Sequence, residues 1–209
     1  MVQPEHEGHR NEEALHEFIT IGIAGPLGAG KSTAGALLEE NFGFPQFTIS
    51  NIFRKLATAQ YFKEPFGREL LGNIYAKLLN EQGEGAAVKL ATELVETYKA
   101  LKEITGATLD GATIEGMRDL HEAVQLKQSP NSYLVILTAP KQERFERIVH
   151  RERVGDITNW DDFNQRDVQE EERLRPLFDI ADLIITNSGN VEELEQQLLH
   201  FVFSKTVLF

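Results

Sequence analysis

The sequence contains no cysteine among its 209 residues, and this absence excludes several kinds of chemistry at once. Without thiols the chain has no disulfide, no zinc site built on thiolates and no cysteine nucleophile, as suits a reducing compartment. No apolar run approaches the ~18 residues that a membrane-spanning helix requires. The polar, acidic start also lacks the basic and apolar stretches of a signal peptide. We therefore expect a cytoplasmic protein without a membrane partner.

Basic residues are also few, because 21 Lys and Arg stand against 33 Asp and Glu, for a formal net charge of -12. A field of this sign repels phosphate backbones, so we expect no nucleic-acid partner. Any small anion must be held by local clusters of Arg, Lys and backbone N–H groups. No linker or repeat divides the chain, so we expect a flexible tail over residues 1–17 and a single domain over 18–209.

The apolar residues indicate the fold class. Nearly continuous apolar runs are typical of strands that are covered on both faces. Helical patterns lie between these runs, and the alternation predicts an α/β domain with a parallel sheet. In the pattern over 86–104, Leu90, Leu94, Leu101 and Ile104, with Tyr98, form an apolar stripe. Five such strand-like runs occur, at 18–24, 46–50, 111–116, 133–139 and 182–187.

Two intervals are longer than a simple crossover requires. Residues 51–105 read as a helical insertion over the sheet, and residues 151–166 form a second insertion between two helical patterns. Both would emerge near the carboxyl ends of strands, where open α/β sheets bind ligands.

Residues 25–32, with the sequence GPLGAGKS, match the pattern G-x-x-x-x-G-K-[ST] between an expected strand and an expected helix. Backbone N–H groups and a helix N-terminus cradle anionic oxygens in such a loop. Lys31 can reach the β- and γ-phosphates, and the Ser32 hydroxyl can hold Mg²⁺. We therefore assign ATP as donor and Mg²⁺ as cofactor. The residues assigned to ATP are Gly25, Pro26, Leu27, Gly28, Ala29, Gly30, Lys31, Ser32 and Thr33.

Arginines are placed selectively in this acidic chain. Arg144, Arg147 and Arg151 stand at i, i+3 and i+7 and so share a helix face. For Arg144 we favour a solvated position beside neighbouring glutamates. For Arg147, Arg151 and Arg166 we favour phosphate contacts, because closing arginines would stabilise a phosphoryl group in transfer. The acidic run 170–172 is interpreted as a solvated helix face, and Trp160 as a packing anchor after a cap at Asn159.

The motifs together resemble the nucleoside monophosphate kinase group of P-loop kinases. After the P-loop come SNIFRKLA at 50–57, IEGMR at 114–118, RFERIVHRER at 144–153 and ADLIITNSGNVEEL at 181–194, in the order typical of that group. Within the group the chain is similar to adenylate kinase, to dephospho-CoA kinase and most of all to uncharacterised archaeal adenylate-kinase-like proteins. The last likeness rests on GRELLGNIYAKLLNEQGEG at 67–85 and WDDFNQRD at 160–167. The resemblance covers about residues 19–200.

The resemblance implies a P-loop NTPase three-layer sandwich, with a five-stranded parallel sheet in the order 2-3-1-4-5. The insertion at 51–105 would bind the acceptor, and 151–166 would form a short lid. The acceptor residues would be Asn51, Arg54, Arg68 and Arg118. Beyond the P-loop, the donor residues would be Arg147, Arg151, Arg166, Asn187 and Gly189. Catalytic roles would fall to Lys31, Glu115, Arg118, Arg151 and Arg166.

Two positions depart from the pattern of the group. Glu115 stands where Asp is usual, but it remains a carboxylate at a strand end, so with Ser32 it can order Mg²⁺ through water; Asp110 is a nearby alternative. Asn51 also replaces an Asp, and an amide cannot accept a proton. A hydroxyl acceptor would need a base worth about 10²–10⁴ in rate, whereas a phosphate acceptor needs only positioning. Glu64 or Glu69 are alternative bases.

Three functions remain open on these grounds. The leading hypothesis is transfer of the ATP γ-phosphoryl group to a nucleoside monophosphate or a similar phosphorylated small molecule. The second is a small-molecule hydroxyl kinase of the dephospho-CoA kinase type. The third is a nucleotide-binding regulatory module without transfer chemistry. The sequence names neither the acceptor, nor ATP over GTP, nor the oligomeric state.

Overall fold

A computed structural model of the chain describes residues 17–61, 68–107, 109–151 and 156–206, with the side chains of residues 60, 61, 68 and 69 outside the described part. Five parallel strands form one sheet in the order β2-β3-β1-β4-β5, which confirms the expected topology. Every side chain of β1 is buried, as its continuous apolar sequence predicts. The strands are β1 (Ile19–Ala24), β2 (Gln46–Thr48), β3 (Gly111–Met117), β4 (Ser132–Thr138) and β5 (Leu183–Thr186).

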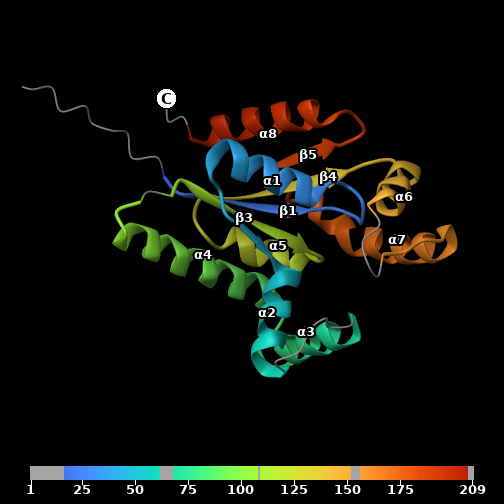
Figure 1. Cartoon of the computed structure of the whole chain (residues 1–209), viewed down its shortest axis with the longest axis horizontal. Coiled ribbons are helices and arrows are strands. Elements are labelled where there is room, and N and C mark those ends of the chain that lie inside the picture. Colours follow the sequence, from blue (N-terminus) through green and yellow to red (C-terminus); the bar gives the residue numbers. More distant parts are fainter. Residues whose placement is uncertain (1–16, 62–67, 108, 152–155, 207–209) are drawn as a thin grey trace, which may run out of the picture.

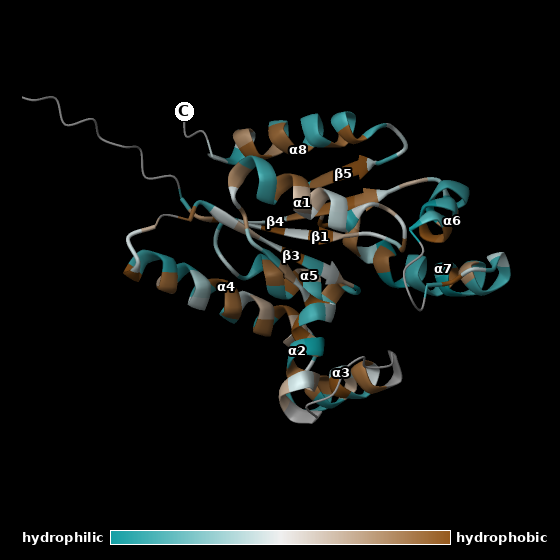
Figure 2. Cartoon of the chain, viewed as in Figure 1, coloured by the Kyte–Doolittle hydropathy of each residue, from teal (hydrophilic) through white to brown (hydrophobic). Residues whose placement is uncertain are grey.

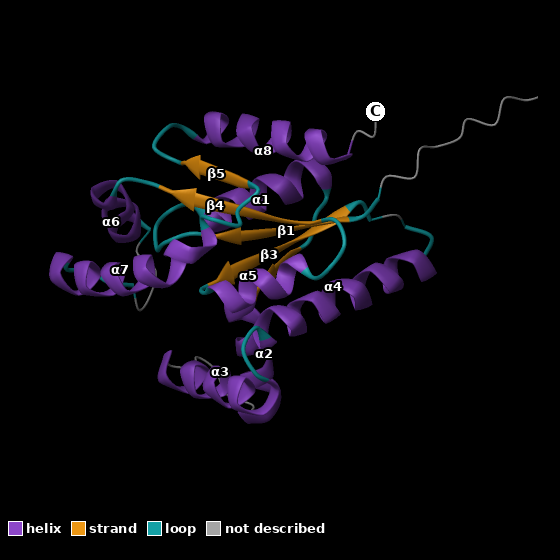
Figure 3. Ribbon diagram, turned by 180° about the vertical axis from the view of Figure 1, so that it is seen from behind, coloured by secondary structure: helices purple, strands orange, loops and turns teal. Residues whose placement is uncertain are grey.

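Helices cover both faces of the sheet and complete a three-layer sandwich (Figure 1). Helices α1 and α8 lie on one face, and α4 and α5 lie on the other. Helices α6 and α7 stand beyond the carboxyl ends of the strands, which point toward them in the view from behind (Figure 3). The helices are α1 (Lys31–Phe42), α2 (Ile49–Tyr61), α3 (Arg68–Gln82), α4 (Ala86–Ile104), α5 (Leu120–Lys127), α6 (Lys141–His150), α7 (Trp160–Leu174), followed by a 3₁₀ turn at Arg175–Leu177, and α8 (Val191–Thr206).

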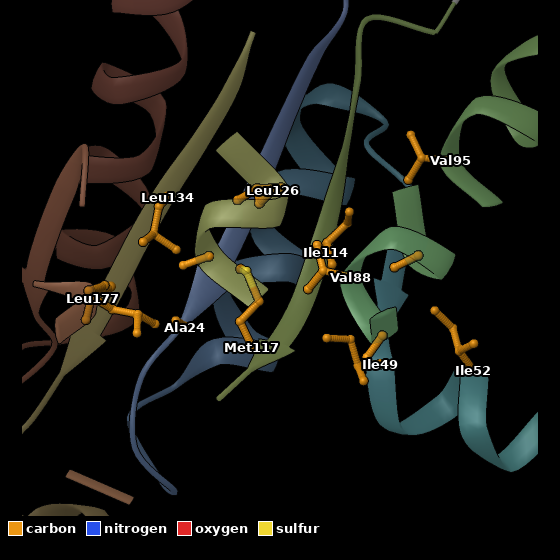
Figure 4. Packing of buried hydrophobic residues seen from close by; sticks show 14 of the residues in the cluster. Ala24, Ile49, Ile52, Val88, Val95, Ile114, Met117, Leu126, Leu134 and Leu177 are labelled. Carbon is orange, nitrogen blue, oxygen red and sulfur yellow. The ribbon is translucent and has the colours of Figure 1, made fainter. Parts of the chain in front are cut away.

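Two hydrophobic clusters hold the layers together. The first packs the sheet against α2, α4 and α5 through residues such as Ile114, Met117 and Leu126 (Figure 4). The second packs the other face against α1 and α8 through Leu38 and Leu198. Hydropathy follows these contacts, since apolar residues gather where the helices meet the strands (Figure 2). Both clusters share the sheet, so the P-loop between β1 and α1 is supported from two sides.

Helix α4 belongs to the core layer, and its buried face differs from the one expected. The helix buries Val88, Ala91 and Val95 against the sheet side, whereas Leu101 and Ile104 are 56% and 81% exposed. The predicted apolar stripe was therefore wrong for Leu94, Leu101 and Ile104, whereas Leu90 and Tyr98 are half-buried and Tyr98 packs against Phe47. Small residues face the core because they let the helix backbone approach the sheet closely.

The long interval between β2 and β3 consequently divides into two parts. Helix α2 starts against the sheet and leads to α3, which projects away from it, while α4 lies along the sheet (Figure 1). The expected insertion at 51–105 thus includes one helix of the sandwich itself. The acceptor lobe of the sequence analysis corresponds to α2 and α3.

The second insertion is also shorter than expected. Helix α6 ends at His150 and α7 begins at Trp160, so the second half of the proposed lid at 151–166 is helical. Asn159 caps α7, because its side chain accepts a hydrogen bond of 2.8 Å from the backbone N–H of Asp162. Trp160 packs against Phe145 with ring centroids 5.2 Å apart, which confirms its role as an anchor. Residues 152–155, like the tail at 1–16, lie outside the described part.

None of the helices in the described ranges combines the length and the apolar character needed to cross a bilayer.

Candidate phosphate-binding and transfer site

The loop between β1 and α1 has the backbone of an anion cradle. Gly28 and Gly30 have φ angles of 81° and 100°, in the left-handed region that favours glycine. A Cβ on Gly28 would collide with the carbonyl of Arg144, and one on Gly30 would collide with the side-chain amide of Asn187. Helix α1 starts at Lys31 with no side-chain cap. Its first N–H groups are therefore directed at whatever anion enters the loop.

The ammonium group of Lys31 folds back over this loop. Its Nζ donates hydrogen bonds to the carbonyls of Gly25 and Pro26, at 2.6 and 2.9 Å. Burial lowers the pKa of Lys31, while the charges of Glu170 and Glu115 oppose that shift. The predicted catalytic lysine thus lies over the loop, within reach of the charges of two carboxylates.

Glu115 supplies a buried carboxylate near the carboxyl end of β3. It is 2% exposed, and burial raises its pKa to about 7, against the charge of Lys31 and a hydrogen bond from Ser32. Gly35 makes room for it, because a Cβ there would overlap the Glu115 carboxylate. Asp110 lies just before β3, at the amino-terminal end of that strand and so away from the P-loop, and it does not replace Glu115 as a site residue.

The residues around Glu115 fit a hydrated Mg²⁺ ion. The Oε1 atom of Glu115 is buried and has no hydrogen-bond partner among the described residues. A buried oxygen of this kind requires a partner, and carboxylate, hydroxyl and water oxygens are the ligands that Mg²⁺ takes. The Ser32 hydroxyl lies next to it, as the sequence analysis expected.

Arg144 lies in the interior, and its predicted solvated position was wrong. Its side chain is 2% exposed and forms a two-pronged pair with Asp167 of α7, with Nη2 to Oδ2 at 2.9 Å. Its Nε donates to the carbonyl of Ala139 at 3.0 Å, and its Nη1 donates to the carbonyl of Leu27 at 3.3 Å. Arg144 therefore ties α6, α7 and the P-loop together.

Asp167 is ionised in this arrangement although it is buried. Burial raises its pKa, but the hydrogen bond and charge of Arg144, joined by Lys141 at 3.2 Å, bring that pKa below its usual value. The pair is thus a charged link between α6 and α7. No spacing rule in the sequence marks it, because the two partners are separated by the segment before α7.

The acidic run at 170–172 is only partly solvated. Oε2 of Glu170 accepts a hydrogen bond of 2.8 Å from the backbone N–H of Leu27, within the P-loop. Glu171 accepts a bond of 3.0 Å from Arg144, and Glu172 alone is exposed without such a contact among the described residues. Nothing local in the sequence distinguishes Glu170 from its acidic neighbours, so its contact with the loop could not be predicted.

Arg147 and Asn187 lie beside the loop, on the side assigned to the donor. The Nη2 atom of Arg147 donates to the carbonyl of Asn187 at 2.8 Å, and the Asn187 amide donates to the carbonyl of Ala29 at 2.9 Å. The Nη1 atom of Arg147 is buried without a hydrogen-bond partner in the described ranges. Gly189 follows, and a Cβ on it would overlap Glu193 of α8.

The two remaining donor-side arginines differ in position. Arg151 pairs with Asp156 at 2.6 and 3.0 Å and is close enough to Lys31 for its charge to lower the lysine pKa. Arg166 is exposed on α7, and within the described residues no hydrogen bond or ion pair joins it to the loop. The structure therefore brings Arg151 to the site and leaves Arg166 facing solvent.

The predicted acceptor residues lie on α2, at the start of α3 and just after β3. Asn51 and Arg54 are exposed on α2, and Arg118 is exposed just after β3. The guanidinium of Arg118 lies 5.9 Å from the ring centre of Tyr75 in α3. Arg68 opens α3, but its side chain, that of Glu69 and the whole of Glu64 lie outside the described part.

A buried carboxylate that the sequence analysis did not identify supports Arg118. Glu122 is fully buried, and it accepts hydrogen bonds from the Tyr75 hydroxyl at 2.7 Å and from the Arg118 backbone N–H at 2.5 Å. Burial raises the pKa of Glu122, and burial together with Glu122 raises the pKa of Tyr75. Glu122 thereby connects the α3 lobe to the loop that carries Arg118.

A glycine-rich anion cradle with its lysine, on a parallel sheet in the order 2-3-1-4-5, defines a P-loop protein of the nucleoside monophosphate kinase type. The profile of a family described as an AAA domain matches residues 21–175, and the chain belongs to that family. The match spans the P-loop, the α2–α3 lobe, Glu115 and α7.

Curated relatives and solved structures agree with this class. A UPF0200 protein of Staphylothermus marinus is 28% identical over 84% of this chain and 86% of its own length. A second, of Hyperthermus butylicus, is 29% identical over 87% and 91%. Shikimate kinase from Acinetobacter baumannii in complex with shikimate superimposes with a TM-score of 0.57 at 20% identity, covering 93% of this chain and 98% of that one. TT1252 from Thermus thermophilus gives 0.52 at 21% identity, covering 92% and 100%. At these identities the two structures show the fold.

Proposed function

We propose that the protein is an ATP- and Mg²⁺-dependent phosphotransferase that transfers the γ-phosphoryl group to a nucleoside monophosphate or a similar phosphorylated small molecule. The observation that carries the proposal is the gathering of Lys31, Ser32 and Glu115 at one end of the anion cradle. A glycine turn without transfer chemistry needs neither the buried ammonium nor the buried carboxylate. The third hypothesis, a nucleotide-binding module, would use the same cradle and the same Mg²⁺ ligands, and it differs from a phosphotransferase in having no acceptor.

In the proposed reaction an oxygen of the acceptor attacks the γ-phosphorus, and the bond from that phosphorus to the β–γ bridging oxygen breaks, releasing ADP. Lys31 and the loop N–H groups would bind the phosphate oxygens as their charge is redistributed. Arg147, with a buried and unpaired Nη1, would turn toward the donor. Mg²⁺, held by Ser32 and through water by Glu115, would neutralise and orient the β- and γ-phosphates when bound.

The acceptor side favours a ligand that is already an anion. Asn51 cannot serve as a base, and Arg118 is exposed toward the α2–α3 lobe, where it can pair with a phosphate. A phosphate oxygen attacks without deprotonation and needs only positioning and charge neutralisation. These residues support a monophosphate acceptor over an alcohol.

One finding favours the second hypothesis, a hydroxyl kinase. The superimposed Acinetobacter structure is a shikimate kinase with shikimate bound, and shikimate is not a nucleotide. A hydroxyl acceptor would require a base, and replacing Asn51 with Asp would supply one at the strand end. A large gain of activity on hydroxyl acceptors in Asn51→Asp, with none on monophosphates, would favour this alternative.

The decisive experiment is a ³¹P NMR screen with Mg²⁺-ATP. The panel contains the nucleoside monophosphates, dephospho-CoA and shikimate, each with wild-type protein and with Lys31→Ala. We expect formation of ADP and a new phosphoanhydride signal with one class of monophosphate, and none with Lys31→Ala. Calorimetry that detects no heat from Mg²⁺-ATP or Mg²⁺-GTP would overturn the proposal. Binding without transfer to any acceptor would support the regulatory module instead.

A further inference from the structure

Residue Leu27 of the P-loop is held through both of its backbone polar groups by side chains that come from beyond the loop. Its N–H donates to Glu170 of α7 at 2.8 Å, and its carbonyl accepts from Arg144 of α6 at 3.3 Å. Its side chain packs on the small hydrophobic cluster of Ile148, Ile157 and Phe163. The loop therefore contacts α7 through a carboxylate as well as through apolar side chains.

We propose that Glu170 is an internal anionic ligand of the P-loop, which the phosphates of a nucleotide displace. The inference rests on the proposed nucleotide site and adds a residue to it. The N–H groups of such a loop serve to bind anionic oxygens, and one of them is already satisfied by a carboxylate oxygen of the same chain. That N–H cannot make the same bond to Glu170 and to a phosphate at full strength.

The charges around the loop support the same conclusion. Burial lowers the pKa of Lys31, the charges of Glu170 and Glu115 raise it, and those of Arg151 and Arg144 lower it. Glu170 has the largest effect of the four charges, so its carboxylate already acts on the cation of the loop. A triphosphate adds at least three negative charges to this space. Glu170 then repels the phosphates unless its side chain leaves the loop. In a chain of net charge -12 no distant positive field offsets that repulsion.

Release of Glu170 does not require α7 to detach from α6. The helix stays attached through the buried pair of Asp167 and Arg144, one turn before Glu170, and through the bond of 3.0 Å between Glu171 and Arg144. Leu174 at the end of the helix also stays in the core, at 2% exposure. Displacement by phosphate therefore needs only a movement of the Glu170 side chain away from Leu27.

The test compares two charge-removing variants on the same helix by calorimetry. Glu170→Gln removes the carboxylate charge at the loop, and Glu172→Gln removes the same charge from an exposed position. Titrations use inorganic triphosphate and, separately, Mg²⁺-ATP, so that phosphate effects are separated from base contacts. We expect Glu170→Gln to bind both ligands about tenfold more tightly than wild type, and Glu172→Gln to stay within about twofold.

Glu170→Ala serves as a second variant, because it removes the hydrogen bond as well as the charge. It is expected to bind inorganic triphosphate at least as tightly as Glu170→Gln, with a thermal unfolding midpoint that confirms a folded protein. Unchanged or weaker binding in both Glu170 variants, with wild type binding normally, would overturn this inference and leave the proposed function standing. Absence of binding in wild type and in all variants would overturn both.

Discussion

Folding buries the Glu115 carboxylate but gives it an incomplete set of hydrogen-bond partners among the described residues. Its Oε1 atom is buried and unpaired among the described residues, and burial raises its pKa to about 7. The unfolded chain would ionise this group near pH 4.5. Between these values the folded state binds more protons than the unfolded state, so its stability falls as pH rises.

We predict that Glu115→Gln removes this pH dependence. The stabilising effect of the substitution relative to wild type should be small at pH 4, grow through pH 5 to 7, and level off above pH 8. The difference across that window should be on the order of 3 kcal/mol. Urea unfolding of both proteins at several pH values, without nucleotide or Mg²⁺, measures it. A difference that is constant with pH would contradict the assigned protonation of Glu115.

Arg144 illustrates a residue whose role depends on tertiary contacts. We predict that Arg144→Ala lowers the free energy of unfolding by about 3 kcal/mol, because it leaves the Asp167 carboxylate buried with Lys141 as its remaining cation. Arg173→Ala, at an exposed position of α7, should change it by less than about 0.5 kcal/mol. The double variant Arg144→Met with Asp167→Leu should recover most of the loss, since no buried charge remains. Equal losses of unfolding free energy in Arg144→Ala and Arg173→Ala would refute the role of Arg144 as a buried link.

The residues of the site differ in how far the sequence reveals them. The P-loop is a contiguous motif whose backbone shape and chemistry are fixed by local residue types, so Lys31 and Ser32 could be located without a structure. Arg144 and Arg147 lie on the same helical face by spacing, yet one is buried and the other borders the loop. Arg144 is buried because the packing of α7 brings Asp167 next to it, and no spacing in the sequence predicts that contact.

At the scale of elements, α4 shows why an apolar stripe does not always mark the buried face. The strands could be located from the sequence, because a short continuous apolar run is typical of a strand that is covered on both faces. In α4 the helix is apolar on more than one side, and the sheet selects the side with the smaller residues. Leu101 and Ile104 lie toward the end of the helix that extends past the core.

This choice of face is testable with a matched pair of truncations. Val95→Ala removes two methyl groups from a position that is 1% exposed, and should cost about 2 kcal/mol of unfolding free energy. Leu101→Ala removes more apolar volume from a position that is 56% exposed, and should cost less than about 0.5 kcal/mol. Chemical denaturation measures both. A larger loss for Leu101→Ala would restore the stripe predicted from the sequence.

At the scale of the whole molecule, one sheet joins everything that the site requires. The P-loop follows β1, and Glu115 lies within the neighbouring strand β3, whose pairing with β1 sets Ile23 opposite Glu115. Both hydrophobic clusters use side chains of that sheet, so the site and the core are parts of one structure. A ligand that binds the loop should therefore stabilise the entire domain rather than a local segment.

We predict that nucleotide binding to the P-loop raises the unfolding temperature of α7 and of the rest of the domain by the same amount. At a nucleotide concentration of 100 times its dissociation constant, binding adds about 2.7 kcal/mol to the stability of the folded state. For a domain of this size the unfolding midpoint should rise by about 7 °C. The shift should be the same by far-UV circular dichroism and by the fluorescence of Trp160, the single tryptophan, which lies on α7 rather than on the sheet.

The control is Lys31→Ala, which should abolish the shift at the same nucleotide concentration, because the ammonium group of Lys31 is the cation inside the cradle. A shift seen by fluorescence alone would show that α7 responds to nucleotide as an independent unit, and the description of one cooperative domain would then be wrong.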